Sequence, residues 1–336
     1  MVRRTWKAEG EKMKDILQVN HVNKFYYEKR KRSFQALQDI SFTVKPGEIF
    51  GILGPNGAGK TTMIKCICGL LFFEEGEISV NGYSMKKNRR EGLRYISAVL
   101  EGNRNIYWRM TVQENLIFFA GINGVSKSAI KDRMNDLIER FHLQEQRHQV
   151  VNYLSRGMKQ KVAIAISLIT NKPIIMLDEP TLGLDVNMTL EMRGMLQEIA
   201  REDQKTILLS THDLHVVEAI CNRVLIINKG KVVAQDSVQN LGTLMNRQIY
   251  QIKLHSPVNI QEIASMNKQI GIISEKRNGI EQTIIIELKE VDDLYDLLGL
   301  IKDSGGHLID LTKQHKNLEG IFLDLIKEEQ KDEIPL

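Results

Sequence analysis

Residues 54–62 read Gly-Pro-Asn-Gly-Ala-Gly-Lys-Thr-Thr, and this stretch decides the fold. It satisfies the pattern G-x-x-x-x-G-K-[ST]. The apolar run 48–53 before it predicts a buried strand, and residues 63–68 behind it can continue as a helix. Glycines let backbone N–H groups curve around phosphate oxygens, and a helix start adds partial positive charge. The stretch therefore predicts a site for a nucleoside triphosphate, formed by Asn56, Gly57, Ala58, Gly59, Lys60, Thr61 and Thr62.

A second apolar run, 172–177, ends in Asp178 and Glu179. Because α/β sheets carry their chemistry at the carboxyl ends of their strands, we expect both acids beside the phosphates. Lys60 can reach the β- and γ-phosphates. Asp178 and the Thr61 hydroxyl are predicted to hold Mg²⁺, which prefers oxygen ligands. Glu179 is predicted to be the general base for an attacking water.

The order of these motifs resembles that of ABC-type ATPases. Between the loop and the Asp-Glu strand lies Leu154-Ser155-Arg156-Gly157-Met158, and after the strand comes Ser210-Thr211-His212-Asp213. The family's signature usually reads Leu-Ser-Gly-Gly-Gln, so Arg156 replaces its first glycine and Met158 its glutamine. The resemblance covers residues 14–240. It implies an α/β P-loop NTPase core with a helical subdomain at about 102–160.

The resemblance also implies that ATP is bound between two chains. Ser155 and Gly157 would face the γ-phosphate that the opposite subunit holds, and Asp185 would contact the partner. His212 would hydrogen-bond the γ-phosphate and position the attacking water. A hydroxyl and a backbone N–H at a helix start suit an anion in any case.

Two positions need separate comment. Tyr26 matches the aromatic residue that stacks on adenine in this family, although the neighbouring Phe25 or Tyr27 could do so instead. Glu101 stands where the family normally has glutamine, after the strand predicted at 95–100. A carboxylate still suits Mg²⁺, so we expect Glu101 to be a metal ligand that makes turnover more sensitive to pH.

The last third of the chain, 241–336, carries no nucleotide motif and is predicted to be a small α+β domain. Apolar patterns and an Asn278-Gly279 turn signal indicate the order β-α-β-β-α-β, that of a ferredoxin-like split fold, followed by an amphipathic helix at 318–326. Such a domain could regulate the ATPase, form a dimer, or be a packing appendage that binds no ligand. Residues 1–13 are expected to be a flexible extension.

Composition narrows the remaining choices. The 336 residues are 42% hydrophobic and 26% charged, as in globular proteins, and no apolar run approaches the ~18 residues of a membrane span. Cys66, Cys68 and Cys221 are too few for a disulfide framework, so we expect buried thiols in a reducing compartment. The basic run 29–32 could contact anionic lipid or nucleic acid, but a solvated hairpin tip is the simpler interpretation.

These inferences together predict an ATP-hydrolysing subunit of an exporter, similar to the bacterial ABC-2 type for drugs, sodium or polysaccharides. ATP would close a homodimer on the cytoplasmic face of the cell membrane and so drive a separate transmembrane permease. The alternative is a soluble ABC ATPase that acts on ribosomes or nucleic acid. A single phosphate loop, with no inserted coiled coil or zinc cysteines, disfavours it, and no specific nucleic-acid partner is expected. A nucleotide kinase or GTPase would not predict the Ser155 signature.

Overall fold

The computed structural model describes residues 15–28, 31–102, 106–244, 248–266, 270–290 and 292–314. The extension expected at 1–13 and the helix expected at 318–326 lie outside these ranges. The chain divides into two compact units, Met1–Val238 and Gln239–Leu336.

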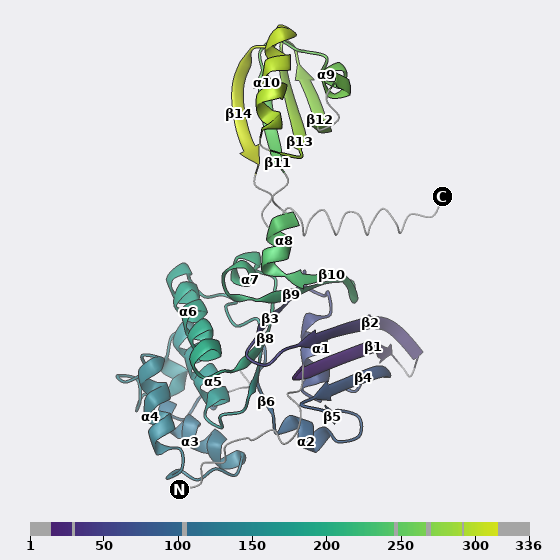
Figure 1. Cartoon of the computed structure of the whole chain (residues 1–336). Coiled ribbons are helices and arrows are strands. Elements are labelled where there is room, and N and C mark those ends of the chain that lie inside the picture. The colour runs from purple at the N-terminus through teal and green to yellow at the C-terminus, as the bar shows by residue number, and fades with distance from the viewer. Residues whose placement is uncertain are drawn as a thin grey trace. The chain divides into compact units, whose positions relative to one another are not determined.

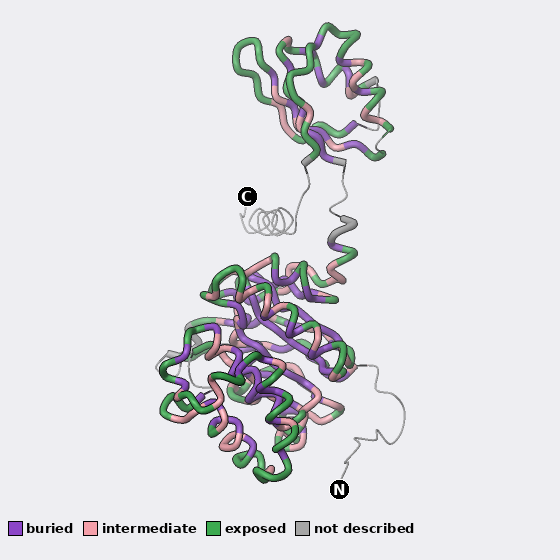
Figure 2. The backbone as a smooth tube through the Cα atoms, turned by 90° about the vertical axis from the view of Figure 1, so that its left-hand side faces the viewer, coloured by how far each residue is buried: buried purple, intermediate pink, exposed green. Residues whose placement is uncertain are grey.

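A six-stranded sheet forms the centre of the first unit (Figure 1), in the order β10-β9-β3-β8-β7-β6. All neighbouring pairs are parallel except β10 with β9. Every residue of β3, β7 and β8 is buried, as expected for parallel strands covered on both faces, and Figure 2 shows this concentration of buried residues. The strands are β3 (Ile49–Leu53), β6 (Ile96–Val99), β7 (Ile174–Asp178), β8 (Thr206–Thr211), β9 (Arg223–Asn228) and β10 (Lys231–Ser237).

A second, antiparallel sheet of the same unit has the order β2-β1-β4-β5. Its strands are β1 (Leu17–Glu28), β2 (Lys31–Val44), β4 (Glu75–Val80) and β5 (Tyr83–Ser84). Glu28 pairs with Lys31, so β1 and β2 form a hairpin, and residues 29 and 30 of the basic run expected at its tip lie outside the described ranges. The Phe42 ring of this sheet stacks on Phe50 of the central sheet with 5.3 Å between centroids. One hydrophobic core therefore joins the two sheets.

Helices fill the segments between the strands of the central sheet. Thr111 begins α3 with a capping box formed with Glu114, and the Tyr107 ring packs on Phe118 at 4.5 Å between centroids. The described residues between β6 and β7 are therefore mainly helical, and α5 continues as one helix to Leu168. The helices are α1 (Lys60–Ile67), α2 (Arg89–Leu93), α3 (Val112–Ile122), α4 (Lys131–Arg140), a 3₁₀ turn at Val151–Tyr153, α5 (Arg156–Leu168), α6 (Val186–Glu202) and α7 (Leu214–Ile220). A further helix, α8 (Val238–Leu244), follows β10.

The three cysteines are buried and free, as predicted. Burial raises the pKa of the Cys66, Cys68 and Cys221 thiols to about 12. Since the thiolate is the reactive and metal-binding form, these side chains are inert packing groups. Within the described residues, no helix has the length and apolarity that crossing a bilayer requires.

The second unit has the element order β-α-β-β-α-β that its sequence indicates. Its four strands form an antiparallel sheet in the order β12-β13-β11-β14, compatible with the ferredoxin-like split arrangement. Apolar residues of the sheet and of both helices form a separate core. Its elements are β11 (Gln248–Leu254), α9 (Ile260–Met266), β12 (Ile270–Asn278), β13 (Glu281–Leu288), α10 (Asp293–Asp303) and β14 (Leu308–Gln314).

Candidate nucleotide site

The phosphate loop joins the carboxyl end of β3 to the start of α1. Gly59 has φ of +108°, and a Cβ there would lie 2.6 Å from the carbonyl oxygen of Ala36, so glycine is required. The buried Lys60 ammonium donates to the carbonyl oxygens of Gly54 and Pro55 at 2.8 and 3.2 Å. The loop thus fixes its own lysine at the point where the helix begins.

Asp178, at the carboxyl end of β7, is 2% exposed and lies beside this loop. Its Oδ1 accepts hydrogen bonds from the hydroxyls of Thr61, at 3.0 Å, and Ser210. Its Oδ2 is buried with no partner among the described residues. An unsatisfied buried carboxylate oxygen is costly, and it suits a cation that would approach from the loop.

Glu179 follows directly, and its carboxylate is shared between a lysine and a histidine. One oxygen lies 3.3 Å from the Lys60 ammonium, and the other lies 2.9 Å from Nδ1 of His212. The backbone of Glu179 has φ of +51°, an unusual conformation for a residue with a side chain. Its N–H donates to the carbonyl and hydroxyl oxygens of Ser210 at 3.1 and 3.2 Å. Such a conformation persists where surrounding contacts hold it, and it is common at active sites.

A cavity of about 450 Å³ opens over the loop and has all the residues predicted at 56–62 in its wall. Of the three candidate rings, Tyr26 lines this cavity, whereas Phe25 is buried in the core. Phe34 pairs with Tyr26 across the β1–β2 hairpin and brings a second ring to the wall. The lining is Tyr26, Phe34, Ala36, Asn56, Gly57, Ala58, Gly59, Lys60, Thr61, Thr62, Glu101, Glu179, Leu182 and His212.

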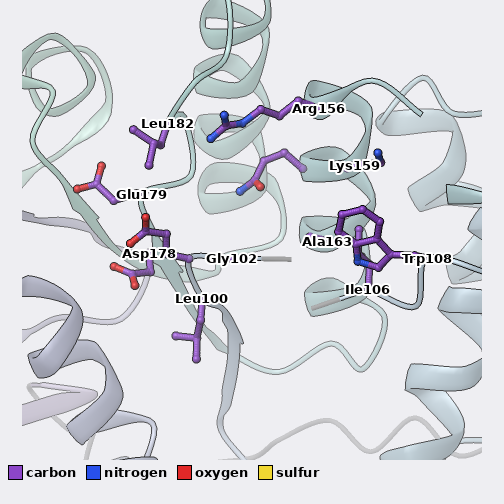
Figure 3. Close-up of a pocket in the computed structure, with 12 residues that line it drawn as sticks. Leu100, Gly102, Ile106, Trp108, Arg156, Lys159, Ala163, Asp178, Glu179 and Leu182 are labelled. Atoms are coloured by element: carbon purple, nitrogen blue, oxygen red, sulfur yellow. The ribbon is translucent and has the colours of Figure 1, made fainter. Parts of the chain in front are cut away.

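A second cavity, of about 400 Å³, lies between the ends of β6 and β7 and the start of α5 (Figure 3). Glu101, Glu179 and Leu182 line both cavities, so the second adjoins the first at the predicted base. Arg156 and Lys159 bring two cations to its wall, and the Lys159 ammonium lies 5.0 Å from the centre of the Trp108 ring. Glu101 is exposed at this junction. Among the described residues, no group of three His, Cys, Asp or Glu side chains could hold a metal ion.

Three of the predicted site residues lie elsewhere. Ser155 caps α5 by accepting from the Met158 N–H at 3.3 Å, and Asp185 caps α6 by accepting from the Met188 N–H at 2.8 Å. Gly157 is buried against the Met188 side chain, which a Cβ there would approach to 2.7 Å. The described lining of the 450 Å³ cavity includes none of the three.

Sequence reasoning missed two residues of the site. Phe34 stands eight residues after Tyr26. The hairpin expected in this region could have predicted that an aromatic residue lies opposite Tyr26. Ser210 opens the quoted Ser-Thr-His-Asp motif but was given no role, although it contacts both Asp178 and Glu179. Its place at the end of β8, beside β7, was the clue.

A family model described as ABC transporter matches residues 37–182. The ABC transporter ATP-binding protein NatA of Bacillus subtilis is 40% identical over 215 residues, 64% of this chain and 87% of that protein. The chain belongs to the ABC transporter ATP-binding proteins. It is therefore an ATPase subunit of a transporter, and the predicted α/β P-loop core is confirmed.

Other relatives of this ABC ATPase extend the comparison. The uncharacterized ABC transporter ATP-binding protein YhcH of Bacillus subtilis is 30% identical over 320 residues, 95% of this chain and 99% of that protein. The methionine import ATP-binding protein MetN 2 of Bacillus licheniformis is 35% identical over 230 residues, 67% of each chain. The similarity to YhcH therefore includes the second unit.

Solved structures match the first unit of this ABC ATPase. A dimeric post-hydrolysis state of the ATP-binding cassette MJ0796 with ADP and Pi has a TM-score of 0.59 and 27% identity, over 66% of this chain and 98% of that one. The cbiO1 subunit of Clostridium perfringens has a TM-score of 0.61 and 28% identity, over 68% and 90%. ATP hydrolysis is accordingly the reaction of this chain.

Proposed function

We propose that this chain hydrolyses ATP as a homodimer with two shared sites, and that it drives export through a separate membrane-spanning subunit on the cytoplasmic face of the membrane. One observation carries the dimer: Ser155 and Gly157 are absent from the described lining of the cavity that contains the phosphate loop. The start of α5, which suits an anion, is thus free to bind the nucleotide that another chain holds. The dimeric structure of the related MJ0796 cassette supports this arrangement.

Each site would combine residues of two chains. The phosphate loop, Lys60 and the Tyr26 ring bind ATP in one chain, and Ser155 and Gly157 of the other chain close over the γ-phosphate. Asp185, at the exposed start of α6, would contact the partner. The γ-phosphate is thereby surrounded by backbone N–H groups, a lysine and a hydroxyl, which is how phosphoryl transfer is generally stabilised.

The residues present fit a magnesium ion. Asp178 supplies the unpartnered buried oxygen, the Thr61 hydroxyl lies 3.0 Å from the same carboxylate, and Glu101 stands at the mouth of the cavity. We propose these three as its protein ligands. The bound ion would neutralise charge on the β- and γ-phosphate oxygens.

Lys60 and Glu179 change partners when ATP binds. In the structure the Lys60 ammonium lies 3.3 Å from the Glu179 carboxylate. The phosphates attract the ammonium and free that carboxylate to accept a proton from the attacking water. His212, 2.9 Å from the other Glu179 oxygen, keeps the carboxylate oriented and contacts the γ-phosphate. Glu179 is the base and His212 its positioning partner.

Export is supported by the resemblance of the motifs to the ABC-2 type. Import is a second candidate, because the methionine import protein MetN 2 is 35% identical. The two directions differ in the membrane partner. Identifying that partner and following cargo in vesicles of known orientation decides between them.

Mixing two inactive variants tests the shared site. Lys60→Ala removes the lysine of the phosphate loop. Ser155→Asp keeps a good helix cap but points a carboxylate at the partner's γ-phosphate. We expect each variant alone to be inactive. A 1:1 mixture should recover about a quarter of the wild-type rate, because half the dimers are mixed and each mixed dimer has one intact site.

Two results would contradict the proposal. Full activity of Ser155→Asp alone would mean that Ser155 faces no nucleotide. A mixture no more active than its components would mean that the site belongs to one chain. Circular dichroism of both variants checks that they fold.

A further inference from the structure

Arg156 occupies the signature position where the family usually has glycine, and its side chain has a definite place. The guanidinium lies against Gly183, in the loop that follows Glu179. A Cβ on Gly183 would lie 2.3 Å from Nη1, 2.4 Å from Cζ and 2.7 Å from Nη2 of Arg156. All three atoms belong to the guanidinium, so the planar group packs over the glycine. In Figure 3 the Arg156 side chain reaches from α5 toward Leu182, on the side where Glu179 lies.

The loop under this guanidinium is directly connected to the catalytic base. The Leu182 N–H donates to the carbonyl oxygen of Glu179 at 3.2 Å, and the Leu184 N–H donates to that of Thr181 at 3.2 Å. Two consecutive turns therefore lead from Glu179 to Gly183, which has φ of +69°. The Glu179 backbone itself has φ of +51° and needs surrounding contacts to stay there. Ser210 holds one side of it, and the turn at Leu182 holds the other.

We propose that Arg156 is a positioning residue for ATP hydrolysis, whose guanidinium holds the 180–184 loop and through it the backbone of Glu179. The first residue of α5 and the catalytic base thus move together within one chain. Ser155, the residue before Arg156, is proposed to close over the ATP that the partner chain holds. Binding of ATP at that site would therefore change the position of Glu179, the base of the chain's own site. This last step rests on the proposed dimer, whereas the Arg156–Gly183 contact does not.

We expect the flat shape of the Arg156 guanidinium, rather than its charge, to hold the 180–184 loop in place. The loop presents a glycine with no side chain, and a flat guanidinium covers such a surface where an ammonium does not. Lys159 lines the same cavity from the same helix, but its ammonium lies over Trp108 rather than over the loop. It therefore serves as a matched control for charge. Carboxylates of Glu101, Asp178 and Glu179 line the cavity too, so a role of charge alone is the alternative to be separated.

A double-mutant cycle of Arg156→Ala and Gly183→Ala tests the proposal in steady-state ATP hydrolysis by the full chain. Arg156→Ala removes the contact and keeps a good helix former. Gly183→Ala displaces the guanidinium from the other side. We expect each to lower kcat severalfold with little change in KM for ATP. The double variant should be no worse than the singles, a departure from additivity of about threefold or more.

Three controls accompany the cycle. Arg156→Lys keeps the charge but should not restore kcat. Lys159→Gln removes a charge from the same cavity and should leave kcat near the wild-type value. Gly124→Ala adds a Cβ at φ of +77° with nothing within 4 Å, and so measures backbone strain alone.

Additive effects on kcat, or full recovery with lysine, would overturn the positioning role. A rise in KM with kcat unchanged would instead place Arg156 on a nucleotide and overturn it equally. The same cycle read in thermal unfolding without nucleotide reports the contact within one chain. If the two substitutions are non-additive in thermal unfolding but the mixing experiment fails, the Arg156–Gly183 contact is supported and the proposed dimer is rejected.

Discussion

Asp178→Asn should make the empty protein more stable and the loaded protein less responsive to magnesium. The Asp178 carboxylate is 2% exposed, and its Oδ2 has no partner among the described residues. Leaving a buried polar atom unsatisfied costs about 1–3 kcal/mol, and more when it is charged. Asparagine keeps the oxygen that accepts from Thr61 and Ser210, and it removes the buried charge. We expect the free energy of unfolding without nucleotide to rise by about 1 kcal/mol.

The response to ligand should change in the opposite direction. At a MgATP concentration of 100 times Kd, binding stabilises the wild-type protein by about 2.7 kcal/mol. Asp178→Asn keeps the phosphate loop but loses the oxygen proposed for the ion. Its stabilisation should therefore be no larger with MgATP than with ATP and a chelator, and its ATP hydrolysis should be lost.

Urea unfolding followed by tryptophan fluorescence, to which Trp6 and Trp108 contribute, measures both effects. Three conditions suffice: no ligand, ATP with chelator, and MgATP. Asp39→Asn is the control, because this carboxylate is 71% exposed and pairs with His21. A variant that is destabilised without ligand, or that keeps the full magnesium-dependent stabilisation, would refute the reasoning.

Three further predictions concern single residues. Phe34→Ala should raise KM for ATP roughly fivefold by removing about 1 kcal/mol of stacking, whereas Tyr27→Ala, outside the cavity lining, should not; equal effects in the ATPase assay would contradict the site. Glu101→Gln should weaken the apparent Mg²⁺ affinity of ATP hydrolysis roughly fivefold, from about 1 kcal/mol of lost attraction, and unchanged magnesium titrations would end its role as a ligand. Burial, with the positive Arg133 nearby, lowers the pKa of Lys205 from 10.5 to about 8, so between these values the unfolded chain binds more protons and stability rises with pH. Lys205→Met should abolish that rise in urea unfolding between pH 8 and 10, and an identical slope in both proteins would contradict it.

Contiguous motifs made the core of the site predictable. The phosphate loop and the Asp178-Glu179 pair each contain their chemistry within a few residues, next to an apolar strand. Parallel strands end at one edge of a sheet, so the two motifs meet without further information. The structure brings them together, since the Thr61 hydroxyl of the loop donates to Oδ1 of Asp178 at 3.0 Å.

Contacts between distant segments were not predictable in the same way. Tyr26 meets Phe34 because the hairpin pairs them in a register that shifts at several irregularities, which hydrophobic alternation does not specify. Arg156 meets Gly183 because α5 and α6 pack together at Gly157 and Met188. No periodicity in the sequence encodes where a long side chain comes to rest across such a junction.

The central claim is that this ATPase is a subunit driving a separate membrane protein. Affinity purification of tagged Glu179→Gln protein from detergent-solubilised membranes in MgATP tests it most directly, because the variant keeps the shape of the site without the base. The account predicts a multi-spanning protein at constant stoichiometry. Recovery of ribosomes, of nucleic acid or of a soluble dimer alone would contradict it.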